Sequence, residues 1–439
     1  MSPLTRRQLL LGTAATAAGA AVGTSLATPA KRLITSTRMP SPADSGIDHI
    51  VVVVMENRSF DHYLGWLPGA DGVQAGLTYL DDSGAPHQTH HLTERQGCGF
   101  NDPDHSYEGG RVQYDGGACD GFRKGGNDDF ALGYYTADDL PFYAPLTKQA
   151  TTFDKWFCSI MSSTYPNRYY THAGRTERKD NAMVTTGMPT VWDRLASANV
   201  TANYYFSDLP FLALWGEKYV DICRPVDTFF AQAASGTLPQ FSYLDPFFLG
   251  EDQGGSNDDH PHADIWRGQA FVSLVAQAIV NSPLWSKTAL IVTYDEWGGF
   301  FDHVAPPQLP DDVPAPGSGD FDHSQAGFRV PAFVLSPYAR RGAIQGAPAT
   351  GAFDHTSMLK FAQWRWNLDP LSPRVDAAAN IADVLDFANP DFSVPSLPVV
   401  VDPGPHICGS PDTGMAAEDP FWVELRDYVR AHPAWRHVV

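Results

Sequence analysis

The chain has 439 residues, of which 43% are hydrophobic, and this composition excludes an intrinsically disordered protein. Its 50 acidic and 30 basic residues give a net charge of −20, which argues against a nucleic-acid-binding groove and against tight adhesion to anionic membranes. A zwitterionic or small soluble substrate is compatible with that charge.

The N-terminus has the features of an export signal. Twin arginines at Arg6–Arg7 precede a stretch rich in Ala, Gly and Leu that runs to about Val22, and Ser25–Ala27 offers a small-residue cleavage site. The stretch is short and weakly hydrophobic for a membrane anchor. We therefore predict a twin-arginine signal at 1–30, a linker at 31–46, and secretion to the periplasm, the cell wall or the extracellular space.

A largely β-branched run, Ile47–Met55, opens the predicted core. A run of this kind without polar alternation indicates a strand buried on both faces, as in a parallel sheet. The chain turns polar directly after it, at Glu56 and Asn57. Taken alone, these two residues could be a helix cap or part of a solvated loop.

Two segments, at about 66–150 and 200–265, are rich in Gly, Asp, Asn and aromatic residues and show little periodicity. We predict that both are insertions over the sheet, where they form a lid, within a single domain that spans 47–439. Neither segment contains a Gly-rich loop of the kind that binds nucleotides.

The five cysteines are an odd number, and none of them forms a C-x-x-C pair, so a cysteine zinc site is not expected. In an oxidising compartment Cys98 and Cys119 are a plausible local disulfide across a Gly-rich loop. The alternative is that several cysteines are buried thiols. The pairing stays open among Cys98, Cys119, Cys158, Cys223 and Cys408.

The segment Met161–Tyr170 contains a candidate nucleophile. Thr164 precedes Pro166 in a predicted turn before a helix, and a helix N-terminus favours phosphate through its free N–H groups and its dipole. A hydroxyl needs a base or a metal ion to become a good nucleophile. The alternative is an ordinary threonine cap, which this segment alone does not exclude.

A second buried strand is predicted at Thr288–Tyr294, directly before Asp295 and Glu296, and a third at Val330–Ser336. Apolar residues recur at helical spacing in three further segments, at 271–282, 356–366 and 420–431. Alternating strands and helices predict an α/β fold with a mostly parallel sheet flanked by helices.

Ligands of such sheets bind beyond the carboxyl ends of the strands. The oxygen-bearing side chains of Glu56, Asn57, Asp295 and Glu296 follow two of these strands, so we expect them to converge. Converging carboxylates repel one another unless a cation lies between them, and oxygen ligands suit a divalent metal ion. Its identity stays open among calcium, magnesium, manganese, iron and zinc.

Several long motifs resemble those of the bacterial phosphoesterase family, which contains phospholipases C and acid phosphatases. The run V-V-V-V-M-E-N-R-S-F-D-H-Y-L-G within Ile47–Gly65 is similar to its opening motif. The stretch from Leu140–Tyr143 to Thr164–Arg168, then Asp259–Pro261, then Tyr294–Val304 follow in the family's order. The resemblance covers about 47–370 and implies an alkaline-phosphatase-like fold with a metal-bound hydroxyl nucleophile.

Carried over motif by motif, the resemblance implies a set of site residues. Thr164 would be both nucleophile and metal ligand, and His105 and His260 are the best candidates for proton transfer and phosphate binding. Each of these histidines could instead be an ordinary core or surface residue. The metal ligands implied are Glu56, Asn57, Thr164, Asp295 and Glu296, and weaker candidates for phosphate contact are Asn167, Arg168, His262 and His303. The alternative for Arg168 and for His303 is that each supports its loop.

We therefore predict a secreted, metal-dependent phospholipase C that hydrolyses the glycerol-side phosphodiester of phospholipids such as phosphatidylcholine through a phosphothreonine intermediate. The alternative on the same site is a broad-specificity acid phosphatase. A sulfatase is less favoured, because Thr164 stands where that chemistry needs Cys or Ser, and nothing favours a non-catalytic binding protein. The expected partner is a phospholipid or small phosphoester, with transient contact to a membrane surface and no nucleic acid; the oligomeric state stays open.

Overall fold

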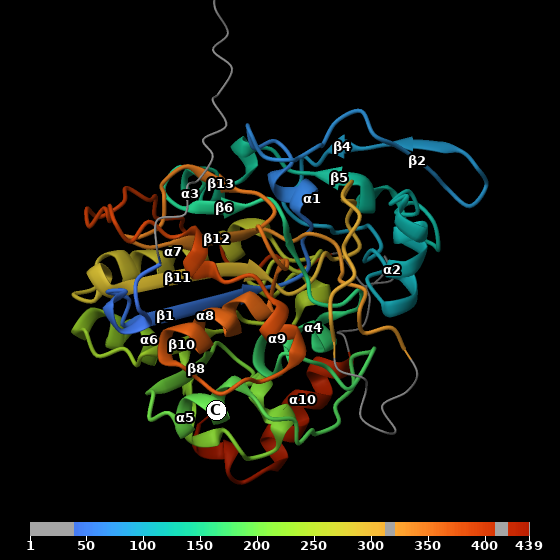
Figure 1. Cartoon of the computed structure of the whole chain (residues 1–439). Helices are drawn as coiled ribbons and strands as arrows, with labels where there is room; N and C mark the ends of the chain where they lie inside the picture. The colour runs from blue at the N-terminus through green and yellow to red at the C-terminus, as the bar shows by residue number, and fades with distance from the viewer. Residues whose placement is uncertain (1–38, 312–320, 409–419, 439) are drawn as a thin grey trace, which may run out of the picture. The chain divides into compact units, whose positions relative to one another are not determined.

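The computed structural model describes residues 39–311, 321–408 and 420–438 of the chain (Figure 1). The predicted signal at 1–30 and the first part of the linker, 31–38, lie outside these described residues. Within the described ranges, no helix is long and apolar enough to cross a membrane.

A central sheet of eight strands organises the described part of the chain, in the order β13-β6-β12-β11-β1-β10-β8-β9. All neighbours pair in parallel except β12, which is antiparallel to both β11 and β6. This confirms the predicted mostly parallel sheet. The strands are β1 (His49–Met55), β6 (Thr151–Phe153), β8 (Ala202–Phe206), β9 (Cys223–Pro225), β10 (Phe241–Leu244), β11 (Thr288–Tyr294), β12 (Ala332–Leu335) and β13 (Ala343–Gln345).

The predicted strands at the centre of the sheet are confirmed. Strands β1 and β11 lie side by side in Figure 1, and their register runs from His49 opposite Thr288 to Met55 opposite Tyr294. Their β-branched residues are buried on both faces, as the unbroken apolar runs predicted. Because the two strands end at the same level, the residues that follow them meet at one edge of the sheet.

Ten α-helices flank this sheet and its loops in the described residues. The predicted helices at 356–366 and 420–431 are confirmed with these bounds. The helix predicted at 271–282 begins earlier, because the Asp264 side chain caps it by accepting a hydrogen bond from the Trp266 amide at 2.9 Å. The helices are α1 (Phe60–Leu64), α2 (Tyr107–Tyr114), α3 (Tyr143–Leu146), α4 (Thr164–Ala173), α5 (Val191–Ser197), α6 (Val226–Ser235), α7 (Ile265–Val280), α8 (Thr356–Trp366), α9 (Pro373–Ala377) and α10 (Pro420–Ala431).

The segment 200–265 is not an insertion, and this part of the prediction is wrong. It supplies β8, β9 and β10 to the central sheet, together with helix α6. These strands have three to five residues and no β-branched run, so they lack the sequence pattern of β1.

The segment 66–150, in contrast, contributes no strand to the central sheet. It forms helices α2 and α3 and small paired strands, and the lid stays a prediction. Three two-stranded pairs lie outside the central sheet: β2 (Thr78–Leu80) with β3 (Pro86–Gln88), β4 (His90–His91) with β5 (Gly133–Tyr134), and β7 (Trp156–Phe157) with β14 (Phe353–Asp354).

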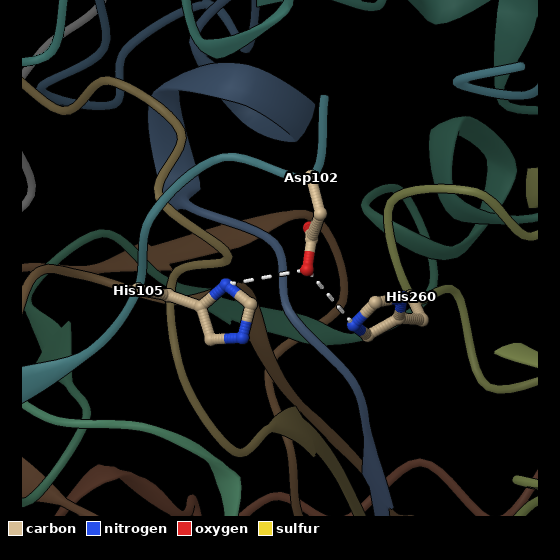
Figure 2. A group of neighbouring side chains, drawn as sticks. All are labelled: Asp102, His105 and His260. Carbon is tan, nitrogen blue, oxygen red and sulfur yellow. Dashed lines mark ion pairs between the residues drawn. The ribbon is translucent and has the colours of Figure 1, made fainter. Parts of the chain in front are cut away.

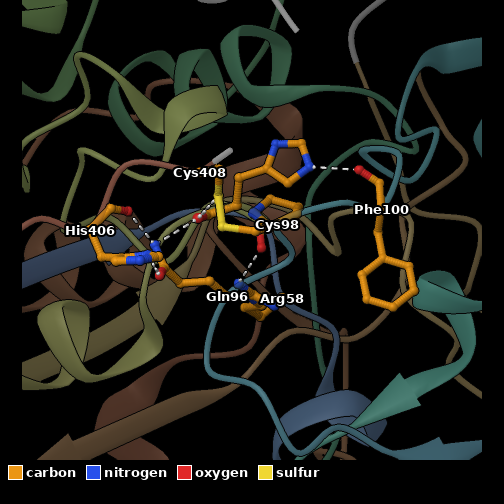
Figure 3. Close-up of a disulfide and its surroundings, with 8 residues drawn as sticks. Arg58, Gln96, Cys98, Phe100, His406 and Cys408 are labelled. Atoms are coloured by element: carbon orange, nitrogen blue, oxygen red, sulfur yellow. Dashed lines mark hydrogen bonds between the residues drawn. A yellow bond between two sulfur atoms is a disulfide. The ribbon is translucent and has the colours of Figure 1, made fainter. Parts of the chain in front are cut away.

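The disulfide joins Cys98 to Cys408, not to Cys119 (Figure 3). The two cysteines are 310 residues apart, so local spacing gave no sign of the pairing. The chain returns to the Cys98 loop near its C-terminal end, where the Gln96 side chain donates a hydrogen bond to the His406 carbonyl at 2.8 Å. Cys119 is a buried thiol, as are Cys158 and Cys223.

Candidate functional site

The acidic ends of β1 and β11 meet, as the parallel register requires. The Asp295 carboxylate accepts hydrogen bonds from the backbone amides of Asn57 at 3.2 Å and Glu296 at 2.7 Å. Asn57 has a left-handed backbone with φ of 59°, which turns the chain sharply after β1. Glu56, Asn57, Asp295 and Glu296 are all fully buried. The structure therefore places the four residues at adjacent strand ends, and their role as metal ligands stays a prediction.

Thr164 joins this group from helix α4, of which it is the first residue. Its hydroxyl donates a hydrogen bond to the Glu56 carboxylate, with 3.2 Å between Oγ1 and Oε2. The side chain is buried, and its place at a helix N-terminus is the one the sequence predicted. The hydroxyl thus lies at the buried end of β1, in contact with one of the predicted carboxylate ligands.

Arg168, one turn further along α4, lies beneath the carboxylates rather than facing a substrate. Its Nε atom donates to Glu56 and to Asp295, each at 2.9 Å, and Nη1 donates to Asp245 at 2.6 Å. The guanidinium is fully buried. Carboxylates occupy its hydrogen-bonding groups, which favours the alternative that Arg168 supports the site from below, and its contact with phosphate stays a prediction.

Asn167 has a structural role, and its predicted phosphate contact stays a prediction. Its Oδ1 atom accepts from the Ile160 amide at 3.0 Å, and its Nδ2 atom donates to the carbonyls of Ile160, Ser162 and Ser163. These bonds tie the loop before Thr164 to the first turn of α4. Asn167 thus fixes the backbone that carries the Thr164 hydroxyl.

The site has more negative charge than its own cations offset. Burial, and then the neighbouring Asp295, raise the pKa of Glu56 well above its usual range, although Arg168 opposes the shift. The Oδ1 atom of Asn57 and the Oε1 atom of Glu296 are buried oxygens without a hydrogen-bond partner among the described residues. Buried polar atoms normally have partners, so these atoms fit the coordination of a divalent cation.

Two histidines from different loops face each other next to this group (Figure 2). The ring centroids of His105 and His260 are 6.0 Å apart, and His105 Nε2 lies 3.8 Å from Glu296 Oε1. Burial lowers the pKa of His105, but the charges of Glu296 and Asp102 outweigh it and raise that pKa to about 10. Burial and the neighbouring cations hold the pKa of His260 well below its usual range.

Asp102 completes the histidine pair, and sequence reasoning did not select it. Its carboxylate forms ion pairs with both histidines (Figure 2), and Oδ2 lies 3.9 Å from His105 Nδ1 and 3.7 Å from His260 Nε2. The only sequence signal was its position three residues before His105. Asp245, which binds Arg168 from the end of β10, was missed because β10 itself was not predicted.

The two weaker histidine candidates have different surroundings. His262 lies near His260, with 6.5 Å between ring centroids, and its Nε2 atom is 3.2 Å from the Phe100 carbonyl. His303 instead binds Asp61, with 2.5 Å between Nδ1 and Oδ2, and Asp71, with 3.2 Å between Nε2 and Oδ1. His303 therefore holds its loop against other loops, as the alternative reading of this residue expected, and its phosphate contact stays a prediction.

Comparison with known proteins adds to this geometry. The sequence model of the phosphoesterase family matches residues 47–369. The chain is 31% identical to non-specific phospholipase C6 of Arabidopsis thaliana, over 78% of this chain and 72% of the relative. It is also 31% identical to phospholipase C B of Mycobacterium tuberculosis, over 90% of this chain and 87% of the relative.

Among solved structures, a protein of the alkaline phosphatase superfamily from Vibrio parahaemolyticus is 11% identical. The match has a TM-score of 0.37 and covers 80% of this chain and 74% of that chain.

Proposed function

Because the chain belongs to the phosphoesterase family, and is a phosphoric ester hydrolase of the phospholipase C type, we propose that it cleaves phospholipids at the glycerol-side phosphodiester with Thr164 as nucleophile. The observation that carries the proposal is the position of the Thr164 hydroxyl, 3.2 Å from Glu56 where the acidic strand ends converge. Phosphatidylcholine is the substrate we expect.

The reaction proceeds by two displacements at phosphorus. The Thr164 hydroxyl loses its proton and its oxygen bonds to phosphorus, while the bond from phosphorus to the glycerol oxygen breaks and diacylglycerol leaves with a proton. Water then attacks phosphorus, the bond to Thr164 breaks, and the phosphorylated head group departs. The intermediate is a phosphothreonine ester that still carries the head group.

A divalent metal ion would be held by the side chains of Glu56, Asn57, Thr164, Asp295 and Glu296. When bound, such an ion lowers the pKa of a coordinated hydroxyl and neutralises charge that develops on phosphoryl oxygens. The residues themselves orient the hydroxyl: α4 fixes its backbone, and Asn167 fixes the preceding loop.

His105 and His260 transfer the protons. The two rings lie 6.0 Å apart beside Glu296, and we assign His105 to donate a proton to the leaving oxygen and His260 to accept one from water. Supporting this assignment, His105 lies 3.8 Å from Glu296, at the edge of the Thr164 site.

We also propose that the twin-arginine segment exports the protein. The disulfide between Cys98 and Cys408 supports an oxidising compartment, since such bonds are rare in the cytosol.

Hydrolysis of para-nitrophenyl phosphorylcholine, compared with para-nitrophenyl phosphate, tests the proposed activity. We expect the diester to be preferred, and we expect a chelator to abolish the activity and an added divalent ion to restore it. Preference for the monoester would instead assign an acid phosphatase to the same site. Full activity after removal of all bound metal, checked by elemental analysis, would contradict the metal-dependent mechanism.

A further inference from the structure

The Arg58 side chain is fully buried and donates hydrogen bonds to three consecutive backbone carbonyls. Its Nε atom donates to the carbonyl of Asp259 at 2.6 Å, and its Nη2 atom donates to those of His260 at 3.1 Å and Pro261 at 3.4 Å. Its Nη1 atom lies 2.9 Å from Nε2 of His62. Because a buried charge needs partners of this kind, Arg58 and the turn that carries His260 depend on each other.

The three carbonyls belong to residues 258–261, called the histidine turn below. Asp259 has a left-handed backbone with φ of 76°, which residues other than glycine rarely adopt and which persists only where the surroundings fix it. The Asp258 carboxylate accepts a hydrogen bond from the His260 amide at 2.9 Å, and the Tyr294 hydroxyl donates to the Asp259 carboxylate at 2.5 Å. The orientation of the His260 ring therefore depends on the contacts that hold this turn.

The histidine turn is bonded to the strand ends that carry the predicted metal ligands. The Glu56 amide, directly after β1, donates to the Asp258 carbonyl at 2.8 Å. The Arg58 amide donates to the Glu296 carbonyl at 3.0 Å, so the backbone that carries the guanidinium is fixed beside the end of β11. The Arg58 side chain thus extends from the two strand ends to the turn that carries His260.

We propose that Arg58 is a positioning residue, which holds the His260 ring in the orientation needed for proton transfer. This inference rests on the proposed function, in which His260 accepts a proton from water. The bonds from the guanidinium to the histidine turn all end at main-chain oxygens, so Arg58 acts through the backbone of His260 and not on its ring. Lysine keeps the charge but lacks the planar fork of donors, so it does not hold three carbonyls in the same geometry.

A double-mutant cycle between Arg58→Lys and His260→Ala tests the proposal. In the wild-type background, Arg58→Lys should lower kcat for para-nitrophenyl phosphorylcholine by about 10- to 100-fold, the usual effect of misplacing a reacting group. In the His260→Ala background the same replacement should change kcat by less than about twofold, because the group that it displaces is already absent. Equal losses in the two backgrounds would overturn the proposal, since a smaller folded fraction lowers kcat alike in both.

Arg329→Lys is the matched control. The Arg329 guanidinium is also fully buried, but it donates to the carboxylates of Asp61 and Asp302 in other loops. Its replacement should therefore change kcat by the same factor in both backgrounds.

Two further measurements accompany the cycle. Urea unfolding checks that each variant folds; if Arg58→Lys does not, Arg58→Gln, which removes the buried charge and keeps an amide donor, takes its place. Elemental analysis measures bound metal. Loss of metal from Arg58→Lys would overturn the proposal, because Arg58 would then act on the strand ends and not through His260.

The single variants separate failure of this inference from failure of the proposed function. If His260→Ala lowers kcat but the effects of the two replacements multiply, the proposed function stands and the role of Arg58 is contradicted. If His260→Ala keeps the wild-type kcat, Arg58 positions no reacting group and the inference fails, while Thr164 is unaffected. If the wild-type protein does not hydrolyse the diester, the proposed function fails and the inference falls with it.

Discussion

Replacement of Thr164 by alanine is expected to lower kcat for para-nitrophenyl phosphorylcholine by at least about ten-thousand-fold, because the variant lacks the oxygen that attacks phosphorus. The expected loss is large because the Thr164 hydroxyl, buried against Glu56, is the proposed nucleophile. Alanine offers no atom that can replace it. Steady-state kinetics at saturating substrate give the effect on kcat.

Two controls accompany this variant. Thr164→Ser keeps the hydroxyl and is expected to retain far more activity than the alanine variant. The stability of Thr164→Ala should change by only about 1 kcal/mol, the usual contribution of one hydrogen bond, so a folded but inactive protein is expected. Activity of Thr164→Ala within tenfold of the wild type would remove Thr164 from the role of nucleophile.

Replacement of Arg168 by methionine is expected to lower the free energy of unfolding by about 3–5 kcal/mol, because it leaves buried carboxylates without their cation. Glu56, Asp245 and Asp295 all accept hydrogen bonds from this one guanidinium. Methionine fills a similar volume, so lost charge rather than a cavity dominates the effect. Urea unfolding of the wild-type and variant proteins measures the difference.

The matched control is Arg426→Met, which removes an arginine whose ion pair with Asp427 is exposed. Surface pairs of this kind contribute about 0–1 kcal/mol, so little change is expected. A loss below about 1 kcal/mol for Arg168→Met as well would show that the carboxylates do not depend on Arg168. Another positive charge would then have to compensate the buried carboxylates that surround Arg168.

The parts of the fold with a strong local pattern were predictable from the sequence. Strands β1 and β11 are continuous apolar runs that end in acidic residues, and this pattern predicted both their burial and the convergence of Glu56 with Asp295. Strands β8 and β10 are short and rich in tyrosine, with hydroxyl groups that bond inside the protein, so no apolar run marks them.

Contacts between distant segments were not predictable. The motif that contains Thr164 also contains Arg168, but only the folded chain shows that carboxylates from three different strand ends surround the guanidinium. The same limit applies to Cys408, which pairs across 310 residues, and to Asp102, whose partner His260 lies on a remote loop. Sequence spacing carries no information about such pairs.

The covalent intermediate on Thr164 is tested most directly by stopping the reaction with acid during turnover of para-nitrophenyl phosphorylcholine. Mass spectrometry of the peptide that contains Thr164 then shows whether the side chain carries the phosphoryl head group. We predict a mass increase equal to the phosphorylcholine group, located on Thr164 and absent from Thr164→Ala. An unmodified Thr164 peptide, under conditions in which product forms in a burst equal to the enzyme concentration, would contradict the mechanism.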